Sequence, residues 1–154
     1  MEPEAAPVTP PLLEVRDLAT HFFTRAGVVK AVDGVSFSLA SGETLGLVGE
    51  SGSGKTLTGF SLLGLVDHPG RVVRGSIRFE GRELVGMHPA GLRAMRGRRL
   101  AMVFQDPMMT LNPVLRIDTQ MVEAILAHEK VSEAAARARA LETLAMVGIP
   151  APAE

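Results

Sequence analysis

Cysteine is absent from the 154 residues of this chain, which excludes disulfide bonds, thiolate metal sites and thiol nucleophiles and fits a reducing cytosol. No run of 18 or more apolar residues occurs, so no segment is expected to span a membrane. The first residues are acidic and rich in proline, without the basic start and apolar stretch of a signal peptide. Any link to a membrane is therefore expected to run through a partner protein.

An excess of charge of one sign is also lacking, since the net charge is −1. No stretch has a large excess of Lys and Arg, so we expect no nucleic-acid partner. A hydrophobic content of 46% and a charged content of 21% are typical of an ordinary globular protein. The length suffices for one domain with a real core but is short for two.

One stretch organises the rest of the chain. The apolar run 44–48 is followed at 49–56 by the pattern G-x-x-x-x-G-K-T, and then by a helix-permissive segment at 57–66. The order of strand, glycine loop and helix is the context in which this pattern binds phosphate. The simpler alternative is a glycine-rich turn with an incidental lysine.

The residue types within this loop suit a phosphate site. Gly49, Gly52 and Gly54 let the backbone curl with its N–H groups pointing inward. The start of the next helix adds free N–H groups and the positive end of its dipole. Lys55 is expected to reach the β- and γ-phosphates, and the Thr56 hydroxyl to ligate Mg²⁺.

The residues before the loop predict an antiparallel β layer. Residues 1–11 contain four prolines and are expected to be a disordered lead-in. Strands are predicted at 12–23, 28–32 and 35–39, with the last two joined by a hairpin turn at Asp33-Gly34.

The residues after the loop alternate between short strands and helices. A second hairpin is predicted at 75–84 and a short helix at 89–95. Four arginines are grouped around this helix and are expected to form a solvated face rather than an anion site: Arg93, Arg96, Arg98 and Arg99. The apolar run 100–104 predicts a strand buried on both faces of a mainly parallel sheet, and helices are predicted at 117–128 and 132–147.

These features together resemble the ATP-binding subunits of ABC transporters. The β layer precedes the phosphate loop, and strand 100–104 ends in Gln105, about 50 residues after Lys55. The run Val103-Phe104-Gln105-Asp106-Pro107-Met108-Met109-Thr110-Leu111-Asn112-Pro113 is similar to the glutamine loop of the oligopeptide, dipeptide and nickel importer branch. Gly42 to Lys55 is similar to that branch too, whereas Met109 departs from its usual small hydroxyl residue.

The resemblance implies an α/β fold, namely a P-loop NTPase (RecA-like) core with an N-terminal antiparallel β subdomain and the start of an α-helical subdomain. Residues 12–113 would form the N-terminal half of the ATPase core. Residues 114–154 would begin the helical subdomain, and the fold would be incomplete.

The resemblance also implies roles for individual residues. Phe22, or its neighbour Phe23, would stack on the adenine, although adjacent phenylalanines in a strand also suit a core. Gln105 would contact Mg²⁺ or the attacking water and, with Lys55, serve catalysis; its alternative is a polar cap at a strand end. The triphosphate and Mg²⁺ would be held by Gly49, Glu50, Ser51, Gly52, Ser53, Gly54, Lys55 and Thr56.

Three motifs of the family are missing from these 154 residues: an L-S-G-G-Q-type signature, an apolar strand ending in Asp-Glu, and a switch histidine. In the family, ATP lies between the phosphate loop of one subunit and the signature of another. We therefore expect the isolated chain to bind nucleotide at best, with weak or no ATPase activity and marginal stability.

Within that family the implied partners are integral membrane permease subunits, a second ATP-binding subunit and, indirectly, an extracytoplasmic solute-binding protein. The implied place is the cytoplasmic face of the cell membrane, and the cargo stays open among peptide, dipeptide, nickel and others.

One alternative interpretation of the chain is a non-catalytic nucleotide-binding fragment or truncated gene product. Another is a GTPase or small-molecule kinase, which the D-x-x-G match at 67–70 suggests and the missing N-K-x-D motif opposes.

Overall fold

The computed structural model describes residues 10–105 and 110–151, and these fall into two compact units, Met1–Arg96 and Gly97–Glu154. The division between the two units falls after Arg96. The boundary predicted between residues 113 and 114 separates the ATPase core of the family from its helical subdomain, and it stays a prediction. None of the helices in the described ranges is long and apolar enough to cross a bilayer.

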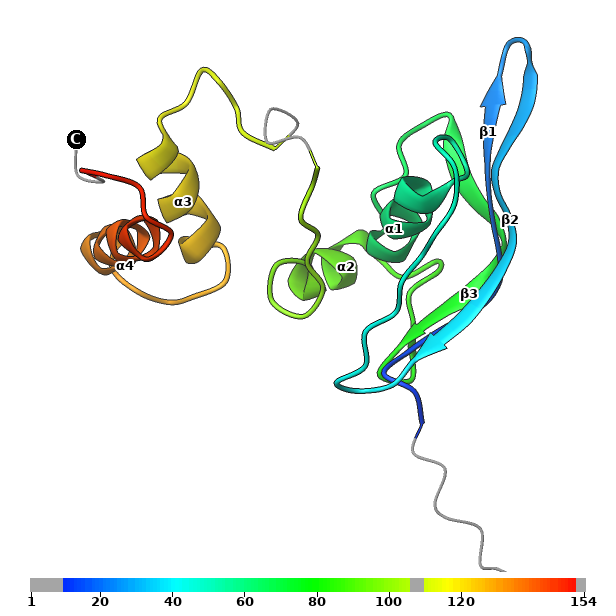
Figure 1. Cartoon of the computed structure of the whole chain (residues 1–154), viewed down its shortest axis with the longest axis horizontal. Helices are drawn as coiled ribbons and strands as arrows, with labels where there is room; N and C mark the ends of the chain where they lie inside the picture. The colour runs from blue at the N-terminus through cyan, green and yellow to red at the C-terminus, as the bar shows by residue number, and fades with distance from the viewer. Residues whose placement is uncertain (1–9, 106–109, 152–154) are drawn as a thin grey trace, which may run out of the picture. The chain divides into compact units, whose positions relative to one another are not determined.

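The first unit is built on one antiparallel sheet (Figure 1). Its strands are β1 (Leu13–Thr24), β2 (Gly27–Leu39), β3 (Gly70–Phe79) and β4 (Arg82–Glu83), in the order β2-β1-β3-β4. The central strand β1 pairs with β2 through a tight turn and with β3 from later in the chain. The predicted β layer and the predicted hairpin at 75–84 are both confirmed.

The hairpin turn predicted at Asp33-Gly34 is wrong, because β2 runs through this dipeptide as one continuous strand. Asp33 pairs with Ala19 and Val35 pairs with Leu18, so the register shifts at Gly34. Gly34 has a φ of 83°, a left-handed conformation that glycine adopts without steric cost. The turn-like dipeptide therefore marks a β-bulge, which is another position that favours glycine in a strand.

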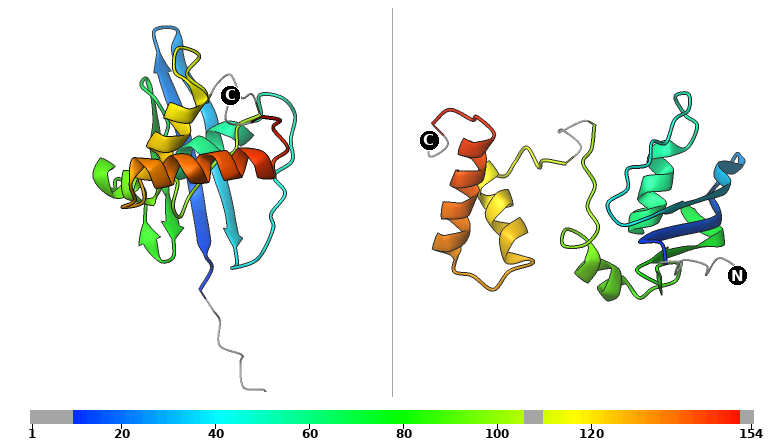
Figure 2. Two further views of the ribbon diagram at one scale, coloured as in Figure 1. Left: turned by 90° about the vertical axis from the view of Figure 1, so that its left-hand side faces the viewer. Right: turned by 60° about the horizontal axis from the view of Figure 1, so that its bottom comes forward.

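Helix α1 (Lys55–Leu63) packs on one face of this sheet, as Figures 1 and 2 show. The helix ends earlier than the predicted Val66, because Gly64 takes a left-handed conformation with a φ of 60°. Buried apolar side chains fill the space around the sheet and helix: Val15, Leu18, Ala19, Val32, Leu63, Ile77, Phe79 and Leu84.

A buried pair of hydroxyl groups joins α1 to β1. The Oγ1 atom of Thr20 and the Oγ atom of Ser61 lie 2.7 Å apart, and both residues are almost fully buried. Ser61 donates its single hydroxyl proton to the carbonyl oxygen of Leu57 at 2.7 Å. Thr20 therefore donates to Ser61, and Ser61 is the acceptor on which the buried Thr20 hydroxyl depends.

Replacing Ser61 by alanine should lower the free energy of unfolding by about 1–3 kcal/mol, because the Thr20 hydroxyl is left buried without its acceptor. Adding Thr20→Val to Ser61→Ala should recover part of this loss, since no unpaired hydroxyl then remains. Urea unfolding of the two single variants and the double variant gives the coupling energy, expected at about 1 kcal/mol. Strictly additive effects would contradict this assignment.

Helix α2 (Pro89–Met95) has the predicted bounds. Pro89 occupies the first helical position, where its missing N–H group costs nothing. The Nδ1 atom of His88 accepts a hydrogen bond from the backbone N–H group of Ala90 at 3.3 Å and caps the helix. The His-Pro pair thus sets the start of α2.

The strands predicted at 44–48 and 100–104 are wrong, since neither segment forms a β ladder in the structure. Every residue of 44–48 is exposed, whereas in 100–104 the exposed residues Ala101 and Val103 alternate with half-buried ones; the relative accessibilities of Val48 and Val103 are 93% and 96%. A strand of a parallel sheet needs neighbouring strands for its N–H and C=O groups. Within the described ranges, 44–48 has no such neighbour and 100–104 has only a single bridge residue, Leu100, so hydrophobicity alone does not make them strands.

The second unit contains α3 (Ile117–Leu126) and α4 (Glu133–Met146), which lie side by side in both views of Figure 2. Both helices confirm the sequence prediction. The Oγ atom of Ser132 accepts the backbone N–H group of Ala135 at 3.2 Å and caps α4. Val122 of α3 is buried, and two small residues of α4, Ala136 and Ala140, are buried as well. Their small side chains allow close helix packing.

An ion pair between Asp118 of α3 and Arg137 of α4 should make the stability of this helix pair depend on pH. The hydrogen bond from Arg137 lowers the pKa of Asp118 below its ordinary value of 3.8. The stabilisation is therefore present above that value and is lost as the pH falls through the lowered pKa of the folded protein. Thermal melts between pH 2 and 7 should show this loss in the wild-type chain and a smaller one in Arg137→Gln. Equal losses would exclude the ion pair as the cause.

Candidate nucleotide-binding site

The glycine loop at 49–56 is folded by two left-handed residues. Gly52 has a φ of 81° and Gly54 a φ of 88°, conformations that are strained for residues with a side chain. A Cβ atom added to Gly54 would lie 2.3 Å from the carbonyl oxygen of Ala31 in β2, whereas a Cβ atom on Gly52 would meet nothing within 4 Å. Two features therefore require glycine at position 54, namely its left-handed backbone angle and its close approach to the sheet.

Lys55 folds its side chain into the bend of this loop. Its Nζ atom donates to the carbonyl oxygens of Gly49 and Glu50, both at 2.7 Å, and to the Oγ atom of Ser53 at 3.3 Å. The ammonium group therefore sits inside the curve that the backbone makes. This is the position from which it can meet an anion placed in the loop.

The loop leads directly into the N-terminus of α1. Gly54 is the N-cap residue and provides no side-chain hydrogen bond to the helix. The amide groups of the first turn are therefore left for another acceptor, at the positive end of the helix dipole. A hollow of about 150 Å³ opens at this point. It is lined by Gly52, Ser53, Gly54, Lys55, Thr56 and Leu57.

The structure thus brings together the whole predicted phosphate site. Gly49, Glu50 and Ser51 form the exposed outer part of the loop, and Thr56 is exposed in the first turn of α1. The contribution of Ala31, whose carbonyl oxygen packs against Gly54, was missed by the sequence analysis. No pattern in the sequence indicates that a backbone atom of β2 meets the loop.

The two candidate adenine-stacking residues have different surroundings. Phe22 is half-buried in β1, and its ring lies so close to Gly70 that a Cβ atom there would be 2.6 Å from the ring. Phe23 is 40% exposed, and the guanidinium carbon of Arg71 lies 4.3 Å from its ring centroid. Stacking of Phe22 on adenine stays a prediction.

Gln105 is an exposed residue of the second unit, whereas the phosphate loop belongs to the first. Its catalytic and metal-binding roles stay predictions. Part of the predicted glutamine loop, residues 106–109, and most of the predicted lead-in, residues 1–9, lie outside the described residues.

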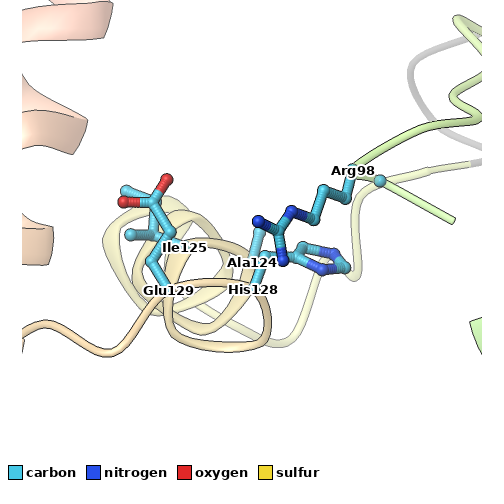
Figure 3. Close-up of a pocket in the computed structure, with 6 residues that line it drawn as sticks. Arg98, Ala124, Ile125, His128 and Glu129 are labelled. Atoms are coloured by element: carbon cyan, nitrogen blue, oxygen red, sulfur yellow. The ribbon is translucent and has the colours of Figure 1, made fainter. Parts of the chain in front are cut away.

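A second hollow, of about 590 Å³, lies within the second unit (Figure 3). Arg98, His128 and Glu129 are among its lining residues, and the carboxylate of Glu129 points away from the side chains of Arg98 and His128. A Cβ atom on Gly97 would be 2.4 Å from the Nε2 atom of His128, so the backbone closely approaches this ring. The hollow lacks the glycine loop and helix N-terminus that make residues 49–56 a phosphate site.

The family model of ABC transporters matches residues 32–153 of the chain. The chain belongs to this family. Among curated members, the oligopeptide transport ATP-binding protein OppD of Bacillus subtilis is 48% identical over 142 residues, covering 92% of this chain and 40% of that protein. The dipeptide transport ATP-binding protein DppD of Haemophilus influenzae is 45% identical over 141 residues, covering 92% of this chain and 43% of that protein. The chain therefore spans about two fifths of their length.

Solved structures confirm the ABC cassette fold. The dimeric structure of MJ0796, a bacterial ABC transporter cassette, superposes with a TM-score of 0.74 at 20% identity over 87% of this chain and 56% of that chain. The ADP conformation of MJ1267, an ATP-binding cassette of an ABC transporter, gives a TM-score of 0.57 at 21% identity over 92% and 55%. The predicted fold class, an N-terminal portion of an ABC ATPase domain, is thereby confirmed.

Proposed function

We propose that this chain is the nucleotide-binding portion of an ATP-binding subunit of a peptide importer, and that residues 49–56 bind the phosphates of ATP. The observation that carries the proposal is the placement of the Lys55 ammonium group inside the glycine loop at the N-terminus of α1. Membership of the ABC family and similarity to proteins named for oligopeptide and dipeptide transport support it.

Each part of the loop would act on a different part of the nucleotide. The first-turn amides of α1 and the Lys55 ammonium group would bind phosphate oxygens through charge-assisted hydrogen bonds. Thr56 is exposed in that turn, and its hydroxyl oxygen is a donor that suits Mg²⁺. Bound Mg²⁺ would neutralise charge on the triphosphate. Phe22 would provide an apolar surface for the adenine.

Hydrolysis requires more than this loop. Gln105 would orient a water molecule or contact Mg²⁺. The Asp-Glu pair that follows an apolar strand in this family, whose Asp holds Mg²⁺ through water and whose Glu polarises the attacking water, is not in the 154-residue sequence. The signature sequence, which a second ATP-binding subunit presents across the nucleotide, is also not in it. We therefore propose nucleotide binding without steady hydrolysis for the isolated chain.

In the complete protein, the coupling of hydrolysis to uptake would involve permease subunits at the cytoplasmic face of the membrane and, indirectly, a solute-binding protein. A second candidate function is that of a non-catalytic nucleotide-binding fragment. The exposed apolar segment at 44–48, which pairs with no strand among the described residues, favours it.

Calorimetric titration of the 154-residue chain tests the proposal. Mg-ATP should bind at a single site, ADP should compete, and AMP should bind at least about tenfold more weakly, because it lacks the phosphates that the loop contacts. Phosphate release should stay at the level of a blank without protein. Equal affinity for ATP and AMP, or no binding of ATP, would exclude the phosphate site. Steady hydrolysis would exclude the non-catalytic candidate and would also contradict the lack of hydrolysis proposed for the isolated chain.

A further inference from the structure

Helix α1 has a well-defined C-terminal end, opposite the end that carries the phosphate loop. The backbone N–H group of Leu65 donates to the carbonyl oxygen of Phe60 at 2.8 Å, and that of Gly64 donates to Ser61 at 3.2 Å. These two bonds form a Schellman motif around the left-handed Gly64. They leave the carbonyl oxygens of Leu63 and Gly64 without a partner from the motif.

Arg96 supplies the donors for these two oxygens. Its Nε atom lies 2.7 Å from the carbonyl oxygen of Leu63, and its Nη2 atom lies 2.6 Å from that of Gly64. The last turn of α1 contains no basic residue of its own, so a positive charge from another element stabilises the negative end of the helix dipole. Arg96 was expected in a solvated arginine cluster, and this expectation is wrong for its half-buried side chain.

The surrounding packing fits this arrangement closely. A Cβ atom on Gly64 would lie 2.8 Å from the Cδ1 atom of Leu92 in α2 and 3.2 Å from the Nη2 atom of Arg96. The absence of a side chain at Gly64 therefore lets α2 approach the end of α1. Arg96 follows α2 directly and is its C-cap residue, donating its backbone N–H group to Leu92 at 3.0 Å.

Arg96 is also the last residue of the first unit, and the chain continues from it to Gln105. We propose that Arg96 is a positioning residue that ties the C-terminal end of α1, the helix that begins at the phosphate loop, to the polypeptide that leads to Gln105. A change in α1 on nucleotide binding would pass through the two hydrogen bonds to Arg96 and along residues 97–105. This inference rests on the proposed function, because it needs a nucleotide at the loop.

Hydrogen–deuterium exchange of the 154-residue chain, with and without Mg-ATP, tests the proposal. Without nucleotide, Arg96→Gln should speed exchange of the Gly64 and Leu65 amides about five- to tenfold, because the turn that holds them loses two bonds from a charged group. With Mg-ATP, the wild-type chain should show slower exchange at 49–56 and a changed rate at 97–105. Arg96→Gln should keep the slower exchange at 49–56 and lose the changed rate at 97–105.

Two further variants make the result specific. Arg93→Gln removes an exposed arginine of the same helix and should behave like the wild-type chain in both measurements. Arg96→Lys keeps the charge with a single nitrogen donor and should restore part of the response at 97–105, which a general loss of packing would not explain. It also replaces Arg96→Gln in the test if circular dichroism shows that the glutamine variant is unfolded.

The outcomes separate this inference from the function on which it rests. No binding of Mg-ATP to the wild-type chain would overturn the proposed function and the coupling with it. Bound Mg-ATP with no change at 97–105 in the wild-type chain would overturn the inference alone. An equal response at 97–105 in wild type and Arg96→Gln, or an equal loss in Arg93→Gln, would overturn it too.

Discussion

Replacing Lys55 by alanine should weaken binding of Mg-ATP to the 154-residue chain by at least about 100-fold, since it removes charge-assisted bonds to phosphate. The Nζ atom now bonds three oxygen atoms of the loop, at 2.7, 2.7 and 3.3 Å. Phosphate oxygens would replace some of these acceptors without moving the ammonium group far. Titration calorimetry with Mg-ATP measures the loss of affinity.

The control for this variant is Lys130→Ala, which removes an exposed lysine of the second unit and should leave the affinity unchanged. Lys55→Arg keeps the charge but places a larger, planar group in the bend, so it should restore only a small part of the affinity. An unchanged affinity of Lys55→Ala for Mg-ATP would show that the lysine contacts only its own loop.

Replacing Gly54 by alanine should lower the free energy of unfolding of the first unit by about 3–5 kcal/mol, which combines a strained backbone with overpacking. The new Cβ atom would lie 2.3 Å from the carbonyl oxygen of Ala31, and a backbone atom of a paired strand cannot rotate away. Either β2 or the start of α1 must shift. Urea unfolding followed by circular dichroism measures the loss, and Mg-ATP binding should be lost with it.

Gly52→Ala is the matched control. Gly52 has nearly the same φ, 81° against 88°, but its added Cβ atom would meet nothing within 4 Å. It should therefore cost only the strain of a left-handed alanine, about 1–2 kcal/mol. The difference between the two variants measures the contact between the loop and β2. Equal losses would show that backbone strain alone explains both.

Local patterns in the sequence predicted most of the secondary structure. The Ser132 cap of α4, the His88-Pro89 start of α2 and the Glu80-Gly81 turn each act over a few neighbouring residues, and the two helices and the hairpin that they delimit lie where the sequence predicts them. The Asp33-Gly34 dipeptide misled because a glycine with positive φ serves a bulge as well as a turn. Only the pairing of β1 with β2 distinguishes a bulge from a turn at this dipeptide.

Non-local partners explain the larger differences. The segment 44–48 has the hydrophobicity of a strand, but a strand forms only with a neighbour, and no described residue pairs with it. For the site, the glycine pattern predicted the loop, since its conformation depends on the glycines themselves. The contact of Gly54 with Ala31 and the bond from Arg96 to Gly64 come from residues 23 and 32 positions away, which no local pattern indicates.

The order of the strands has a consequence for synthesis of the protein. Both β2 and β3 are hydrogen-bonded to β1. The phosphate loop and α1 lie between β2 and β3 in the sequence. On the ribosome, the hairpin of β1 and β2 emerges first, but the second edge of β1 stays unpaired until β3 has left the exit tunnel. The two ends of segment 40–69, which contains the phosphate loop and α1, are therefore held by the sheet only after Phe79 has emerged, and before α3 and α4 leave the tunnel.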